Sequence, residues 1–92
     1  MNYIQKARQK LASKTDVPEE LLNLYTLLVF VKGANCTLED VHDAWSIWQN
    51  KTFPKHKSLI PFKELSAKVK EYDREYAEAI QEVAEALKNK LK

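Results

Sequence analysis

The sequence predicts an all-α fold, a small compact bundle of about four helices with an extended, proline-containing loop between the third and fourth. Apolar residues recur at spacings of three and four along most of the chain, which is the periodicity of amphipathic helices. The chain has one glycine and three prolines, and so few glycines leave few tight turns for an all-β fold. Its length suits one small domain, so we treat residues 1–92 as a single unit.

The first helix is expected over Asn2–Ser13. Its apolar side chains form a narrow stripe, and its basic side chains lie on the opposite side. The stripe consists of Tyr3, Ile4, Ala7 and Leu11.

A second helix is predicted to begin with Asp16 as the N-cap and Pro18 in the first turn, and to end before Gly33. Nearly every position from Leu21 to Val31 is apolar, so this should be the most buried helix. Gly33 supplies the stop signal, because glycine adopts the left-handed conformation that commonly ends a helix. A central β-strand at Leu27–Val31 is the competing interpretation, which these flanking signals disfavour.

A third helix is predicted to begin at Thr37, after a short extended link over residues 34–36. Asp40 stands three residues after Thr37, which is a variant of the capping box. His42 is offset by about 100° from the apolar face of this helix. That face consists of Leu38, Val41, Trp45 and Trp48.

A polar loop over Asn50–Lys57 and an extended segment over Ser58–Pro61 should follow, since a residue before proline avoids the helical region. Pro61 is suited to open a single helical turn. Ser66 is then expected to cap one last, continuous helix. Its apolar stripe is Val69, Tyr72, Tyr76, Ile80, Val83 and Leu87.

Apolar and aromatic side chains from all but the first helix are predicted to form most of the core, and the loop over residues 58–62 should lie against the helix with the tryptophans. The predicted core is Leu22, Leu24, Tyr25, Leu28, Val31, Val41, Trp45, Trp48, Leu59, Phe62, Val69, Tyr72, Tyr76, Ile80 and Val83.

Two short blocks in the middle of the chain resemble a known family. They read Val41-His42-Asp43-Ala44-Trp45 and His56-Lys57-Ser58-Leu59-Ile60-Pro61-Phe62-Lys63-Glu64-Leu65, and an Asp73-Arg74 pair follows them. Over residues 38–80 they resemble the ryanodine-receptor-type (RyR) repeat domain and related short phage and bacterial proteins. The longer Gly- and Trp-containing insertion of that family is absent, since only Gln49–Lys55 stands between the blocks. The resemblance implies a non-enzymatic accessory module, and for its phage and bacterial members it implies sensing of nucleotide-like ligands.

These blocks form the candidate binding site. Aromatic rings can stack a base, and lysines can hold phosphates with hydrogen bonds from His and Ser side chains. The competing interpretations are structural: histidines that fasten the loop, tryptophans that pack in the core, and lysines in a solvated loop. We predict a groove for a small anionic or nucleotide-like ligand, lined by His42, Trp45, Lys55, His56, Lys57 and Ser58.

The sequence contains no recognisable catalytic or metal-binding constellation. Two histidines without a cysteine partner or clustered carboxylates are a poor set of metal ligands. Cys36 has no evident orienting or oxyanion group, so it is expected to be a small, semi-buried residue rather than a nucleophile. We therefore expect no enzymatic activity, no catalytic residue, no metal and no cofactor.

The charges alternate in blocks along the second half of the chain. Lys51–Lys70 carries six lysines and one acid, a local charge of +5, whereas Glu71–Leu87 carries six acids and one base, a local −5. This alternation argues against a nucleic-acid partner. It also leads to an alternative function, an oligomerising or inhibitory protein–protein interaction through the charged last helix, with a protein partner or a second copy.

Localisation is predicted from what the sequence lacks. Its longest apolar run is too short to span a bilayer, and its first residues have no apolar segment typical of a signal peptide. A single cysteine is typical of a reducing compartment. We expect a cytoplasmic protein without a membrane partner, in the host cytoplasm if a phage encodes it.

Overall fold

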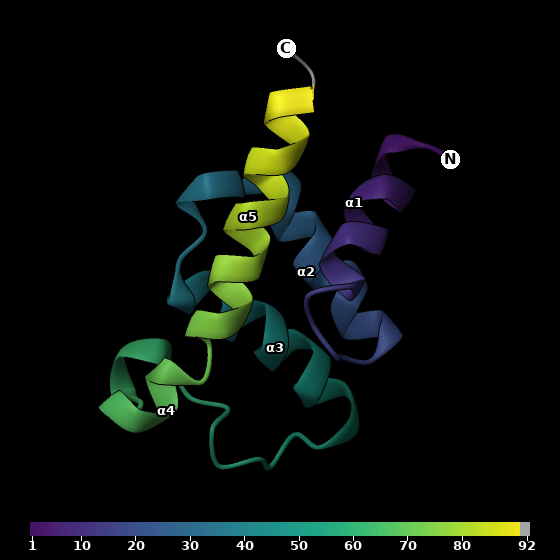
Figure 1. Ribbon diagram of the computed structural model, residues 1–92. Coiled ribbons are helices and arrows are strands. Elements are labelled where there is room, and N and C mark those ends of the chain that lie inside the picture. Colours follow the sequence, from purple (N-terminus) through teal and green to yellow (C-terminus); the bar gives the residue numbers. More distant parts are fainter. Residues whose placement is uncertain (91–92) are drawn as a thin grey trace.

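Helix α2, Glu19–Val31, is the central element of the fold. The helices α1 (Tyr3–Ala12), α3 (Leu38–Thr52) and α5 (Arg74–Lys90) all pack against it. In Figure 1, α1, α2 and α5 lie next to one another and α3 crosses below them. The computed structural model describes the backbone of residues 1–90 and the side chains of residues 1–88. The prediction of an all-α fold with four main helices is confirmed, and no strand occurs among residues 1–90.

The first two helices begin differently from one another. Asn2 caps α1, because its side chain accepts the backbone N–H of Gln5 at 2.8 Å and the Gln5 side chain accepts the N–H of Asn2 at 3.0 Å. The predicted N-cap of α2, Asp16, is wrong. Pro18 occupies the cap position without a side-chain bond, because its fixed φ already suits a helix start.

Helix α2 ends at the predicted glycine, since Gly33 has a left-handed φ of 56°. The next residues were expected to be extended, but Gly33–Asn35 form a 3₁₀ turn, in which the N–H of Cys36 bonds to the carbonyl of Gly33 at 3.1 Å. This turn packs on α5. The Gln81 side chain donates to the carbonyl of Cys36 at 2.7 Å and fixes the corner there.

Helix α3 starts as predicted but runs further. Thr37 and Asp40 form a reciprocal capping box, with bonds of 2.9 and 3.1 Å. The polar loop was expected from Asn50, yet the helix continues to Thr52 and stops at Phe53, directly before Pro54. Proline cannot supply the next helical N–H, which explains the stop.

The prediction of one continuous last helix after Ser66 is wrong, because the structure divides this segment into two helices. After a 3₁₀ turn at Phe62–Glu64, Ser66 caps a five-residue helix, α4 (Ala67–Glu71). The chain then turns at residues 72 and 73, where the N–H of Asp73 bonds to the carbonyl of Lys70 at 3.2 Å instead of continuing the helical pattern. Figure 1 shows α4 set aside from the axis of α5. The sequence has no glycine or proline at this break to reveal it.

The core is centred on α2, α3 and α5, with one face of α1 against them. Two predicted core residues are exposed: Val31, at 62%, and Tyr72, at 63%. Because α2 is apolar on all sides, its periodicity does not tell which side faces outward, and Tyr72 lies in the break before α5. The prediction also omitted several buried small and apolar side chains. They include Ala7, Leu11, Leu21, Val29, Ala44, Ala77 and Ala79.

In the part of the chain that the structure describes, no helix combines the length and the apolar character needed to cross a membrane.

Candidate ligand-binding cavity

A cavity of about 580 Å³ lies between α2, α3, the α4–α5 break and the loop after α3. This volume is in the range of small-molecule sites. The structure brings together, around this cavity, five of the six predicted site residues, which come from two separate segments. They are His42, Trp45, His56, Lys57 and Ser58. The sixth, Lys55, is exposed and does not line the cavity.

Trp45 forms the middle of one wall. The ring of His42 stacks against it with centroids 5.7 Å apart, and the ring of His56 meets it edge-on at 5.1 Å. Both tryptophans are half-buried and line the cavity, so each packs against the core and presents an edge to the open space. The two histidines therefore share a cavity with Trp45 between them.

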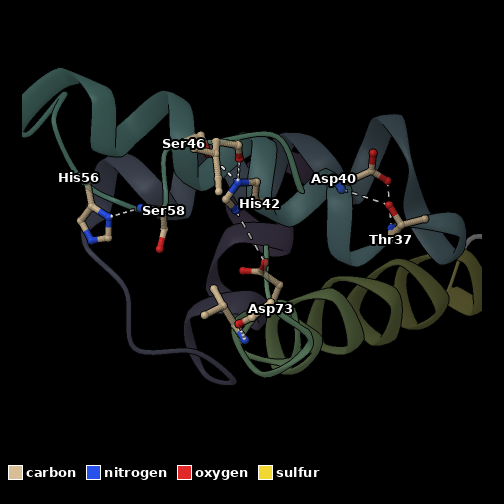
Figure 2. A network of polar contacts seen from close by, with 10 residues as sticks. Thr37, Asp40, His42, Ser46, His56, Ser58 and Asp73 are labelled. Atoms are coloured by element: carbon tan, nitrogen blue, oxygen red, sulfur yellow. Dashed lines mark hydrogen bonds and ion pairs between the residues drawn. The ribbon is translucent and has the colours of Figure 1, made fainter. Parts of the chain in front are cut away.

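His56 is held by its own turn. Its Nδ1 atom accepts the backbone N–H of Ser58 at 3.0 Å, and Figure 2 shows this bond at the edge of the site. An acceptor nitrogen carries no proton, so this bond leaves the N–H of the ring on Nε2. His56 thus contributes an N–H donor to the cavity.

His42 joins three parts of the fold. It is 3% exposed, and its Nε2 atom lies 2.7 Å from the carbonyl oxygen of Ile60, which accepts a hydrogen bond from it. Its Nδ1 atom faces Asp73 at 3.9 Å, and Figure 2 shows His42 between α3 and this carboxylate. The predicted contact of the loop with α3 is therefore confirmed. The histidine that was offset from the apolar face is buried because the loop covers it.

Asp73 and two tyrosines form a side of the cavity that the sequence analysis missed. The Asp73 side chain is 15% exposed, and burial raises the pKa of its carboxyl to about 6, against the influence of His42. Tyr25 is 2% exposed, and its ring packs on that of Tyr76 at 5.6 Å. Burial, and then the nearby Asp73 charge, raise the pKa of Tyr25 above its ordinary range. We call Tyr25, Asp73 and Tyr76 the acidic side.

The opposite side carries His56, Lys57 and Ser58, and we call it the basic side. Figure 2 shows His56 and Ser58 well apart from Asp73, with His42 between them. Lys57 is the single lysine that lines the cavity, although the sequence suggested a larger group. Lys51, for example, pairs with Glu20 at 3.1 Å on another face. The cavity is therefore polar at two places and aromatic between them.

Cys36 lies outside this cavity. It is 2% exposed, and burial, with a smaller influence of Asp40, raises the pKa of its thiol to about 11. The thiol stays protonated at neutral pH, which suits a packing role. Among the described side chains, no three His, Cys, Asp or Glu residues are placed to hold a metal ion.

A family model matches residues 1–85, and its description is "Domain of unknown function (DUF7701)". The chain belongs to this family. No curated protein and no solved structure matches the chain. None of these comparisons links the DUF7701 domain to the ryanodine-receptor-type repeat. The family assignment covers every residue of the cavity, and it names no activity.

The acidic block of the DUF7701 domain lies mostly on the exposed surface of α5. Glu82 pairs with Lys14 at 3.0 Å, and Glu71 pairs with Arg74 at 2.7 Å. Glu75, Glu78 and Glu85 are exposed and form no ion pair with another residue whose side chain is described. Three of the six acids in this block thus have no ion-pair partner among the described side chains.

Proposed function

We propose that this DUF7701 domain is a non-enzymatic module that binds a small, nucleotide-like molecule in the cavity between α2, α3 and α5. One observation carries the proposal: two separate segments converge on a single cavity of about 580 Å³. They are the part of α3 with His42 and Trp45, and residues 56–58 in the loop after α3. Convergent polar groups in an aromatic-lined cavity are typical of a ligand site.

The basic side suits the anionic part of such a ligand. Lys57 supplies a charge, the Nε2–H of His56 supplies a donor, and Ser58 supplies a hydroxyl. Trp45 and Trp48 line the same cavity and suit a planar ring, because aromatic stacking tolerates any flat π-system. The resemblance of the two sequence blocks to the ryanodine-receptor-type repeat supports the same ligand class.

Tryptophan fluorescence tests this proposal, because Trp45 and Trp48 are the two tryptophans of the chain and both line the cavity. We expect adenosine monophosphate to change the emission in a saturable way. Lys57→Ala should weaken the binding about tenfold, as loss of a charge-assisted bond implies. Lys55→Ala is the matched control, since it removes the same charge outside the cavity, and it should bind like the wild type. Equal binding by the two variants, or no response to the nucleotide, would refute the proposal.

An alternative function has its own observation. Glu75, Glu78 and Glu85 on α5 are exposed and form no ion pair with a described side chain, and they give a charged surface that suits a basic partner protein or a second copy of the chain. Replacing Glu75, Glu78 and Glu85 by glutamine should then abolish an association that light scattering detects at low salt. A monomer at every salt concentration argues against the self-associating form.

A further inference from the structure

We propose that the acidic side of the cavity binds a planar cationic nitrogen group of the ligand, an amidinium or guanidinium, with Asp73 as its counter-ion and Tyr25 as a second acceptor. This inference rests on the proposed function and specifies the ligand further. The complete ligand would be zwitterionic, with its anionic part on the basic side.

Two side chains of the acidic side, Tyr25 and Asp73, form no hydrogen bond with a described residue. Tyr25 is 2% exposed, and its hydroxyl is one of these two groups. No fully enclosed side-chain nitrogen or oxygen among the described residues lacks a partner, so this hydroxyl must open onto the cavity that Tyr25 lines. Buried polar groups are nearly always bonded, so a hydroxyl that opens onto a cavity without a protein partner is available to a donor group of a ligand.

The Asp73 carboxylate is the second group of the acidic side without a hydrogen bond. Among the described residues it forms one ion pair, with His42 Nδ1 at 3.9 Å. That histidine already donates its Nε2 proton to Ile60. A nearly buried carboxylate without a donor is costly, and a planar group with two N–H donors satisfies both of its oxygens.

Negative charge surrounds the acidic side. Asp16 lines the cavity together with Asp73, so the nearby acids favour a cation and repel a phosphate. The half-buried ring of Tyr76 also lines the cavity, and an aromatic ring attracts a cation. A phosphate therefore fits the basic side, and a cationic nitrogen group fits the acidic side.

Benzamidinium tests the assignment, with neutral benzamide as its matched control of nearly the same shape. We would follow backbone and indole N–H signals by NMR during titration of the wild-type chain. Benzamidinium should shift the Trp45 indole and the signals around Tyr25 and Asp73, and it should bind about tenfold more tightly than benzamide. Asp73→Asn keeps the shape and should remove this preference, whereas Asp43→Asn, an exposed acid outside the cavity, should retain it.

Phenyl phosphate, titrated in parallel, separates this inference from the proposed function. Binding of phenyl phosphate together with no preference for benzamidinium over benzamide would overturn the cation assignment and leave the proposed function standing. No response to any of the three probes would overturn both. Tyr25→Phe gives a second reading, because it should weaken benzamidinium binding while it keeps the packing of the ring on Tyr76.

Discussion

The Nε2 atom of His42 lies 2.7 Å from the carbonyl oxygen of Ile60, and this bond joins the middle of α3 to the segment that follows its loop. The same ring stacks on Trp45 and faces Asp73. One buried side chain thus positions a wall, a loop and the acidic side of the cavity. The shape of the cavity therefore depends on this residue.

We expect His42→Phe to lower the free energy of unfolding by about 1–2 kcal/mol, because phenylalanine keeps the ring but leaves the Ile60 carbonyl without its donor. Urea unfolding measures this difference. Ser46→Ala is the control, since the Ser46 hydroxyl reaches the same nitrogen only at 3.4 Å and should contribute less. Equal stability of His42→Phe and the wild type would mean that the bond does not hold the loop.

Asp73 should make the unliganded protein less stable as pH rises. Its pKa is raised from an ordinary 3.8 to about 6, so the folded state holds this proton more tightly than the unfolded state. The folded state is therefore favoured below about pH 4, and this advantage disappears as pH rises to about 6. Titratable groups from three helices face this carboxyl: Tyr25 on α2, His42 on α3 and Tyr76 on α5.

Asp73→Asn isolates that contribution, because asparagine is neutral at every pH. Relative to the wild type, the variant should gain stability between pH 4 and pH 7 in urea unfolding. Glu75→Gln, which changes an exposed acid two residues further along the chain, should show no such gain. A constant difference between wild type and Asp73→Asn over this range would contradict a raised pKa.

The capping box of α3 should make a measurable contribution to the stability of the fold. Thr37→Ala removes the acceptor of the Asp40 N–H and should lower the free energy of unfolding by about 1 kcal/mol. Thr52→Ala, at the opposite end of the same helix, is the control, since its hydroxyl makes only a 3.5 Å contact with Gln49. Thermal unfolding of the two variants should show a clear loss for Thr37→Ala alone. Indistinguishable melting temperatures would rule out a stabilising cap.

Cys36 should resist thiol reagents in the folded protein. Its thiol is buried and its pKa is raised to about 11, so little thiolate forms at pH 8. An aromatic disulfide reagent should label it at the rate of unfolding, and promptly in denaturant. Fast labelling in native buffer would show an open or activated thiol instead.

The sequence predicted the fold well where helix signals were local. Gly33 and the Thr37–Asp40 box marked their boundaries correctly, because each needs only neighbouring residues. The sequence did not predict features that depend on how the helices pack, such as which side chains are exposed. The exposure of Val31 was missed because the pattern of an almost wholly apolar helix does not show which side faces outward. The exposure of Tyr72 was missed because the chain breaks between α4 and α5 without a glycine or proline to indicate it.

The candidate site likewise has residues that the sequence predicted and residues that it did not. The sequence placed His42 and His56 in one region through short blocks, and the structure brings both to the cavity. It gave no reason to join Tyr25 to Asp73, since 48 positions separate them and each fits a common role: a core tyrosine and a surface acid. That neither side chain has a hydrogen-bond partner among the described residues becomes visible only once the surrounding atoms are placed.

The most direct test of the central claim, that this cavity holds a small molecule, is native mass spectrometry of the protein purified from the cells that naturally make it. We predict an added mass on the order of a few hundred daltons on the wild type, consistent with the size of the cavity, which is lost on denaturation. The share of protein that carries this mass should fall in Asp73→Asn and Lys57→Ala and stay at the wild-type level in Asp43→Asn. A bare protein mass in every sample, before and after denaturation, would contradict the account.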